Sequence, residues 1–164
     1  IGHKDVKIEE IVRDLLVKYS KKVSTAESCS GGSIAQAFTA IPGCSDWFNG
    51  GVVAYANRAK ARLLRIPIGI INLHGAVSEE VVTLMALNAK KRFGTNYSVA
   101  TSGVAGPTGG TEDKPVGTIW IAVSGPNGEK AKKFKFGKER NINIIRTKIA
   151  ALNLLRMQIL EDNL

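Results

Sequence analysis

Three side chains that could act as nucleophiles stand together in the run TAESCSGG at residues 25–32: Ser28, Cys29 and Ser30. The apolar pattern predicts a strand just before this run and a helix just after it, so the three side chains precede a helix N-terminus. Backbone N–H groups there lack intrahelical partners and carry the positive end of the helix dipole, which favours an anion or a developing oxyanion. The simpler alternative is that Ser28 or Ser30 only caps the helix, since Ser is a favoured N-cap residue.

A lysine is one base that could activate a serine without help from histidine. The chain has only two histidines, His3 and His74, and neither lies in a metal-binding pattern such as H-E-x-x-H. We therefore predict no His-based metal centre, and the option of a Ser–Lys pair gains weight. The pKa of Lys60 would have to fall from ~10.4 to ~7–8, a cost of about 4 kcal/mol that burial or neighbouring positive charge can supply. The alternative is an exposed helix lysine.

The two cysteines, Cys29 and Cys44, are too few for a disulfide scaffold and lack the spacing of a structural zinc site. We expect both to be reduced thiols. Cys29 is a rival nucleophile, because thiols at helix N-termini ionise more readily. A Cys–His dyad is a weaker option.

A glycine-rich loop, GVAGPTGG at 103–110, follows a predicted strand. Its glycines would let backbone N–H groups approach a phosphate closely. The loop is not a Walker A motif, because no Gly-Lys-Ser/Thr follows, and it is not a dinucleotide fingerprint, because a strand rather than a helix comes next. Ordinary turn chemistry is the alternative explanation.

Length and composition predict one domain over residues 1–164. The chain has no apolar run near the ~18 residues that span a bilayer and no basic-then-apolar leader, so we expect a soluble, cytoplasmic protein without a membrane partner. A formal net charge of +9 suits a partner that carries phosphate, either a nucleotide or a nucleic acid. A solvated basic face would explain most of the lysines near the C-terminus equally well.

Alternating helical and extended patterns predict an α/β protein, a single layered α/β/α domain with a mixed sheet on which the N- and C-terminal helices pack. Gly50 and Gly51 suggest a bulge or a close backbone approach, Asn57 and Ser78 are expected helix caps, and Pro126 begins a hairpin turn. The predicted helices cover 6–19, 33–40, 57–64, a segment starting at 78, and 139–160; the predicted strands cover 21–26, 47–55, 97–102, 116–124 and 130–136.

Several segments together resemble one known family, the C-terminal domain of the competence/damage-inducible CinA proteins. They are TAESCSGG at 25–32, PGCSDWF at 42–48, GVVAYAN at 51–57, Lys60, HGAVS at 74–78, SGVAGP at 102–107 and KPVGT at 114–118. That family includes stand-alone nicotinamide-nucleotide amidases. The resemblance implies a hydrolase that deamidates nicotinamide mononucleotide to nicotinic acid mononucleotide and ammonia in pyridine-nucleotide salvage, with no metal and no organic cofactor.

The resemblance also implies roles for particular residues. Ser28 would be the nucleophile and Lys60 the general base, with Ser45 as a reserve nucleophile and Tyr55 orienting or polarising the pair. Arg140 would clamp the substrate phosphate with help from the glycine loop. The helix N-terminus and loop amides would hold the oxyanion. The residues expected to contact substrate are Ser30, Gly31, Ser102, Gly103, Gly106, Thr108 and Arg140.

A non-catalytic nucleotide or nucleic-acid binding module is the alternative function. It depends on the basic strand Lys130–Lys135, whose lysines could track phosphates. Only 6% of the residues are aromatic, and no RNP-like, KH or zinc-finger pattern occurs, so a nucleic acid is the less favoured partner. A homo-oligomer and a fused pyrophosphatase domain, which some family members carry, are arrangements that the sequence leaves open.

Overall fold

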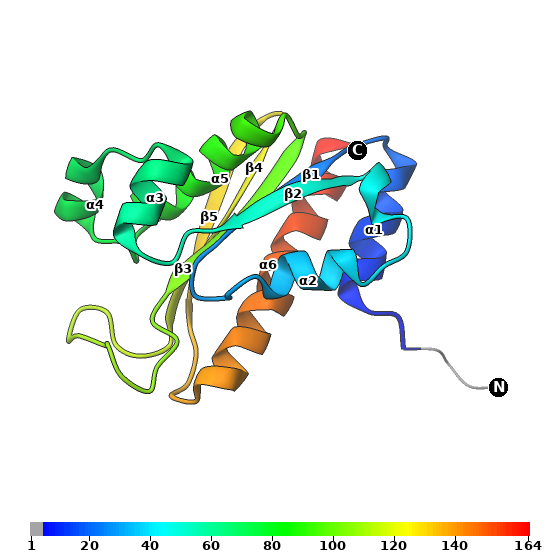
Figure 1. The fold of residues 1–164 in the computed structure, drawn as a ribbon. Coiled ribbons are helices and arrows are strands. Elements are labelled where there is room, and N and C mark those ends of the chain that lie inside the picture. Colours follow the sequence, from blue (N-terminus) through cyan, green and yellow to red (C-terminus); the bar gives the residue numbers. More distant parts are fainter. Residues whose placement is uncertain (1–4) are drawn as a thin grey trace.

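A five-stranded sheet lies at the centre of the computed structural model, which describes residues 5–164 (Figure 1). The strands are β1 (Val23–Glu27), β2 (Phe48–Val53), β3 (Tyr97–Gly103), β4 (Thr118–Gly125) and β5 (Gly128–Lys135), in the order β2-β1-β3-β4-β5. β1 pairs in parallel with both β2 and β3, whereas β4 is antiparallel to β3 and β5. The predicted mixed sheet is confirmed.

Helices cover both faces of the sheet, so the fold has three layers (Figure 1). The helices are α1 (Ile8–Lys18), α2 (Ser33–Thr39), α3 (Asn57–Leu64), α4 (Ile68–His74), α5 (Glu79–Phe93) and α6 (Arg140–Asp162), with a short 3₁₀ helix at Cys44–Asp46. α1, α2 and α6 pack on one face, while α3, α4 and α5 cover the other. Across residues 5–164, no helix has the length and apolar character that crossing a membrane requires.

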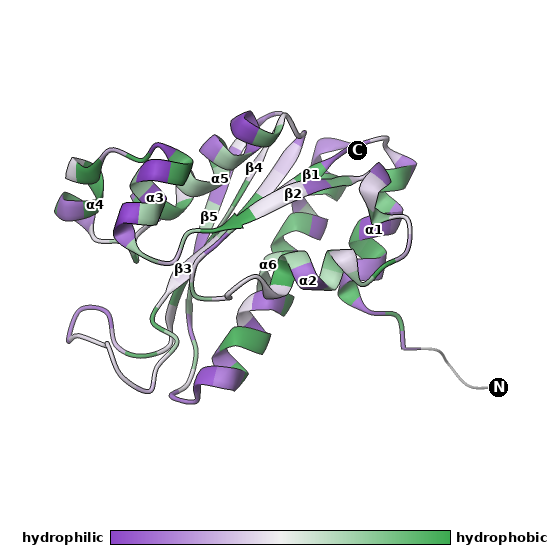
Figure 2. Ribbon diagram, in the orientation of Figure 1, coloured by the Kyte–Doolittle hydropathy of each residue, from purple (hydrophilic) through white to green (hydrophobic). Residues whose placement is uncertain are grey.

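The two cores differ in the size of their side chains. Under α1 and α6 the sheet presents large apolar residues such as Val99 and Ile121, which pack against residues such as Leu152. Under α5 it presents Ala100 and Ala122 instead. Small side chains let α5 lie close to the strands, and Figure 2 shows the matching hydrophobic stripes on the helices that flank the sheet.

β1 and β2 approach each other closely, as the glycine pair predicts. Val23 pairs with Phe48 but Ser24 pairs with Gly50, so one residue of β2 is extra and forms a bulge. A Cβ atom on Gly51 would collide with the side chain and backbone of Thr25. The expected bulge and close approach both occur.

Several local expectations need adjustment. Ser78 caps α5 as predicted, and its hydroxyl accepts the Val81 amide at 3.3 Å. Asn57 is the first residue of α3 rather than its cap, which is Ala56. Helix α4 was not predicted, because seven residues between Pro67 and Gly75 are too few to show a helical period.

Candidate active site

The site lies where β1 and β3 end side by side. β1 leads by way of α2 outward to β2, and β3 leads outward to β4, so the chain leaves the two strands in opposite directions at their carboxyl edge. In open α/β sheets this is the position where ligands bind. Ser28 follows directly after β1, and its amide donates to the carbonyl oxygen of Thr101 on β3 at 3.1 Å.

The structure brings Ser28 and Lys60 together. Lys60 and Leu64, one turn apart, form the buried face of α3, and the Lys60 side chain is only 1% exposed. Its Nζ donates to Ser28 Oγ at 3.0 Å and to the backbone carbonyl oxygen of Tyr55 at 2.8 Å. Two acceptors therefore fix the lysine nitrogen beside the serine hydroxyl.

Burial changes the acid–base behaviour of this lysine. Removal from water disfavours the ammonium form and lowers the pKa of Lys60 from 10.5 to about 8, and the nearby Cys29 thiol only partly opposes this effect. At pH 7 roughly a tenth of the molecules then hold a neutral amine, against less than a thousandth for an ordinary lysine. Lys60 can thus accept a proton near neutral pH.

The expectation of an easily ionised Cys29 is wrong. Its side chain points into the core under α1, α2 and α6 and is 4% exposed. Burial raises the pKa of the Cys29 thiol to about 12, so the thiolate is scarce at neutral pH.

Glu27, which the sequence analysis did not single out, occupies the N-terminus of α2. Its fully buried carboxylate accepts the amides of Ile34 at 2.9 Å and Ala35 at 3.1 Å, and the Ser30 hydroxyl at 2.7 Å. Ser30 Oγ also lies 2.7 Å from Thr101 Oγ1. The α2 amides are therefore taken by an internal carboxylate rather than left for an oxyanion, and Ser30 points into the protein rather than toward a ligand.

Tyr55 and Arg140 are also brought to the site. The Arg140 guanidinium donates to the Tyr55 hydroxyl at 2.8 Å and to the Gly106 carbonyl oxygen at 2.7 Å, which links α6, the end of β2 and the glycine loop. Tyr55 thus holds Lys60 through its backbone carbonyl, while its hydroxyl faces the arginine. Asn143, another residue that the sequence did not reveal, fastens the same loop by donating to the carbonyl oxygens of Ala105 and Gly137, both at 2.9 Å.

The glycine loop lines an open hollow of about 470 Å³. Thr108 lines it, together with Lys138 just before α6. Gly106 has φ +87°, which a residue with a side chain rarely adopts. Gly103 is needed for a different reason, because a side chain at this position would collide with Ile119 of β4.

Three other predicted site residues have structural partners or lie elsewhere. Ser102 is buried and its hydroxyl donates to the Ala76 carbonyl oxygen at 2.7 Å, which fixes the connection between α4 and α5. Gly31 is exposed at φ +64°, and its amide donates to the Ser28 carbonyl oxygen at 3.0 Å. Ser45 precedes β2 and is exposed at the amino edge of the sheet, roughly 16 Å of strand away from Ser28. The structure therefore does not bring the reserve nucleophile to Lys60.

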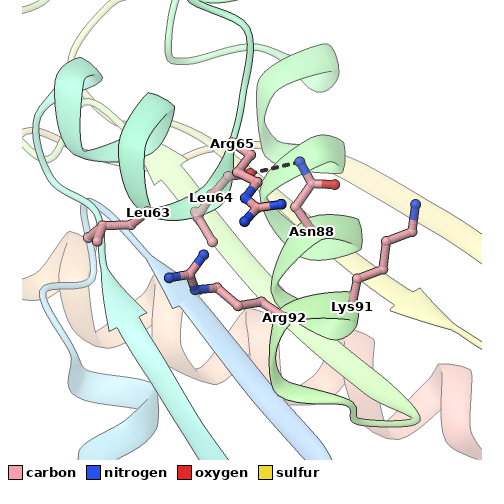
Figure 3. Close-up of a pocket in the computed structure, with 6 residues that line it drawn as sticks. All are labelled: Leu63, Leu64, Arg65, Asn88, Lys91 and Arg92. Carbon is pink, nitrogen blue, oxygen red and sulfur yellow. Dashed lines mark hydrogen bonds between the residues drawn. The ribbon is translucent and has the colours of Figure 1, made fainter.

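A second hollow of about 420 Å³ lies between α3 and α5, away from the serine (Figure 3). Arg65, Lys91 and Arg92 line it, and Asn88 donates to the Leu64 carbonyl oxygen at 2.8 Å, which holds the end of α3 on α5. Neither Ser28 nor Lys60 contributes to its wall.

Metal-binding side chains do not gather in the described part of the chain. Residues 5–164 contain no group of three His, Cys, Asp or Glu side chains arranged to hold an ion. His74 pairs with Glu80 at 3.7 Å, and His3 lies outside the described residues.

Fold and site together define a three-layer α/β protein with a buried serine–lysine pair at the carboxyl edge of its parallel strands. The family model of the CinA C-terminal domain matches residues 5–159. The chain belongs to the CinA C-terminal domain family, as its motifs indicate.

Similar proteins agree with this assignment in sequence and in structure. CinA-like proteins of Parasynechococcus marenigrum and Fervidobacterium nodosum are 45% and 46% identical over 99% and 96% of the chain. The chain spans about two fifths of the length of these curated relatives, 39% and 38%. A CinA superfamily protein of Klebsiella pneumoniae superposes with a TM-score of 0.89 at 27% identity, covering 95% of this chain and 99% of that one. The competence/damage-inducible protein CihA of Agrobacterium tumefaciens gives 0.87 at 35%, covering 97% and 99%.

Proposed function

We propose that this protein is an amidohydrolase that converts nicotinamide mononucleotide to nicotinic acid mononucleotide and ammonia through Ser28 and Lys60. The observation that carries the proposal is the contact of 3.0 Å between Lys60 Nζ and Ser28 Oγ, made by a lysine whose pKa burial lowers to about 8. Burying a charged lysine destabilises the folded protein. A module that only binds phosphate would gain nothing from a buried lysine placed against a serine hydroxyl.

The chemistry follows from these two groups. Neutral Lys60 takes the proton of Ser28 as Oγ attacks the carboxamide carbon, and a tetrahedral intermediate forms. Its collapse breaks the C–N bond, and the Lys60 ammonium returns the proton to the leaving nitrogen, which departs as ammonia. Lys60 then takes a proton from water, whose oxygen attacks the acyl ester. The Lys60 ammonium returns this proton to Ser28 Oγ as the ester C–O bond breaks, and the released carboxylic acid loses its own proton to the solvent as the carboxylate forms.

Charge developing on the carbonyl oxygen needs donors other than the α2 amides that Glu27 occupies. The Ser30 amide, two residues after the nucleophile, donates to no backbone acceptor within residues 5–164, whereas the Cys29 amide faces its own thiol. We assign the oxyanion to the Ser30 amide, where a single donor is typically worth about 3–4 kcal/mol.

The nucleotide phosphate would bind beside Arg140 and the glycine loop. Arg140, already anchored on Tyr55 and Gly106, would present its guanidinium to the phosphate, and Lys138 with the loop around Thr108 would complete the pocket. For the alternative of a nucleic-acid module, two of the four lysines of β5 already have partners within the chain: Lys130 pairs with Glu161, and Lys132 Nζ lies 5.2 Å from the centre of the Phe134 ring.

The direct test is ammonia release from nicotinamide mononucleotide by the pure chain and by two neighbouring variants. We expect Ser28→Ala to lower kcat at least about 10³-fold and Cys29→Ala to retain turnover within about tenfold. Circular dichroism and urea unfolding check that both variants fold. No ammonia from the parent chain over a range of pH, or loss of turnover in Cys29→Ala alone, would refute the assignment.

A further inference from the structure

A long loop between β3 and β4, residues 104–117, forms most of the hollow beside Arg140. The two strands are antiparallel, and a turn of about two residues can join such a pair. Figure 1 shows the loop projecting past the end of the sheet, on the side of the molecule where α4 lies. Residues 107–113 are exposed, and a loop of this length moves unless other parts of the protein hold it.

Two limbs of this loop line the hollow, and they are held in different ways. The first limb is residues 107–111 and the second is residues 115–116. Contacts from α6 fix the chain just before the first limb, because Arg140 and Asn143 bind the carbonyl oxygens of Gly106 and Ala105. Backbone hydrogen bonds of Gly117 fix the end of the second limb. The start of the second limb needs an anchor of its own.

Lys114 supplies this anchor by reaching across to the connection between α4 and α5. Its Nζ donates to the His74 carbonyl oxygen at 2.8 Å, and its side chain is half-buried although the residues before it are exposed. Two hydrogen bonds with Thr111 shape the turn that aims the lysine, at 3.0 Å to the Thr111 hydroxyl and at 2.9 Å from the Thr111 amide. Gly75 has φ +79°, and a Cβ atom there would lie 2.6 Å from Lys114 Nζ. The lysine therefore occupies space that only a glycine leaves free.

This contact joins two sequence motifs that have no part in the proposed chemistry at Ser28. Lys114 begins the motif KPVGT, and His74 and Gly75 begin the motif HGAVS. Ser102, near the end of β3, holds the same connection by donating to the Ala76 carbonyl oxygen at 2.7 Å. The sheet thus fixes the connection between α4 and α5, so that it gives the loop a firm point of attachment.

We propose that Lys114 is a positioning residue, which holds the second limb of the loop on the connection between α4 and α5 and so keeps the hollow in shape. Its effect on substrate rests on the proposed function, because the hollow is where the phosphate would bind. A hydrogen bond from a charged donor typically shifts a local equilibrium by about ten- to a hundredfold, so without Lys114 the loop should open that much more often. A lysine that only capped α4, whose last residue is His74, would leave the loop and the hollow unchanged.

Limited proteolysis with a glutamate-specific protease measures how often the loop opens, because Glu112 lies in its exposed part. In native buffer, Lys114→Met should be cleaved after Glu112 at least about tenfold faster than the parent chain. Lys114→Arg keeps a donor and should stay within about threefold of the parent chain, as should Lys91→Met, which removes an exposed lysine of α5. Mass spectrometry identifies the cleaved bond. Equal cleavage of the parent chain and Lys114→Met overturns the proposal.

Kinetics with nicotinamide mononucleotide test the effect on the hollow. Lys114→Met should raise KM at least about fivefold and leave kcat within about twofold, because the contact between Ser28 and Lys60 is untouched, and Lys114→Arg should restore KM. A Lys114→Met chain that loses free energy of unfolding in urea but keeps its KM assigns the lysine to α4 alone and overturns the positioning role. If the parent chain releases no ammonia, the proposed function fails, and proteolysis alone then decides whether Lys114 holds the loop.

Discussion

At the scale of single residues, Lys60 shows most clearly how the site is built. Its side chain is 1% exposed and binds two oxygen atoms, so it cannot regain the water that an ammonium prefers. Between the folded pKa of about 8 and the unfolded value of 10.5, the unfolded chain holds the proton more often. The free energy of unfolding should therefore rise with pH across that window, and at pH 7 the buried charge should cost about 3 kcal/mol.

Replacing Lys60 by Met should stabilise the protein at pH 7 while abolishing turnover. We expect the free energy of unfolding to rise by about 1–3 kcal/mol, less than the full cost because Ser28 and the Tyr55 carbonyl lose a donor. The gain should shrink as pH rises from 8 and disappear near 10.5. Urea unfolding at several pH values measures it, with Lys91→Met, an exposed lysine of α5, as the control. A variant that is destabilised equally at every pH would contradict the buried-charge account.

The pH dependence of catalysis follows from the same group. If Lys60 is the base, kcat/KM of the parent chain should rise about tenfold per pH unit below 8 and level off above it.

At the scale of elements, the position of Ser28 depends on how β1, β2 and α2 meet. Glu27 ends β1 and accepts the first free amides of α2, so one buried carboxylate joins the strand to the helix that follows. β2 reaches β1 only because Gly51 has no side chain to strike Thr25. Both contacts set the direction in which the chain leaves β1, and hence where the serine hydroxyl lies.

Two glycine variants test whether a glycine is needed for the close approach of β1 and β2 or only adds backbone flexibility. Gly51→Ala should destabilise the protein by about 2–4 kcal/mol, because the added methyl group overlaps Thr25 and forces the strands apart. Gly69→Ala, in α4 where a Cβ meets nothing within 4 Å, should stabilise it by about 0.5–1 kcal/mol through helix propensity. Urea unfolding compares the two. Similar effects of both substitutions would show that β1 and β2 are not in tight contact at this point.

At the scale of the whole molecule, the candidate site gathers groups from distant parts of the chain. Ser28, Lys60 and Arg140 come from the β1 end, α3 and the start of α6. Arg140 also holds the glycine loop through Gly106. A ligand that contacts all three side chains would therefore bind only the folded molecule and should stabilise it as a unit.

Binding of the proposed product should be visible in thermal unfolding. Nicotinic acid mononucleotide at about 100 times its Kd should add about 2.7 kcal/mol and raise the Tm by roughly 5–10 °C. At the same ligand concentration, Arg140→Lys should lose much of this rise in Tm, because lysine cannot bind a phosphate in a bidentate manner. The control Arg13→Lys on α1 should keep the rise. An equal Tm gain in the parent chain and in Arg140→Lys would place the phosphate elsewhere.

Local sequence patterns predicted most of the secondary structure, because hydrophobic periods, caps and turns involve residues only a few positions apart. The mixed sheet, its flanking helices and the cap at Ser78 were predicted in this way. Ser28 and Lys60 were also singled out, and the structure brings them into contact at 3.0 Å, while their catalytic roles stay a prediction. Ser45 was kept as a reserve nucleophile because it lies in a matching family motif, but it precedes a parallel strand and lies at the opposite edge of the sheet from Ser28.

The sequence by itself determined most of the segments that become strands and helices, with α4 as the exception, the family, and the residues that could form a serine–lysine pair. Only the tertiary structure decided that Lys60 is buried beside Ser28, that Glu27 takes the α2 amides and that Cys29 points into the core. Burial and hydrogen bonding between distant segments depend on the order and direction of the strands. Strand order is a property of the assembled sheet, and no short stretch of the chain contains it.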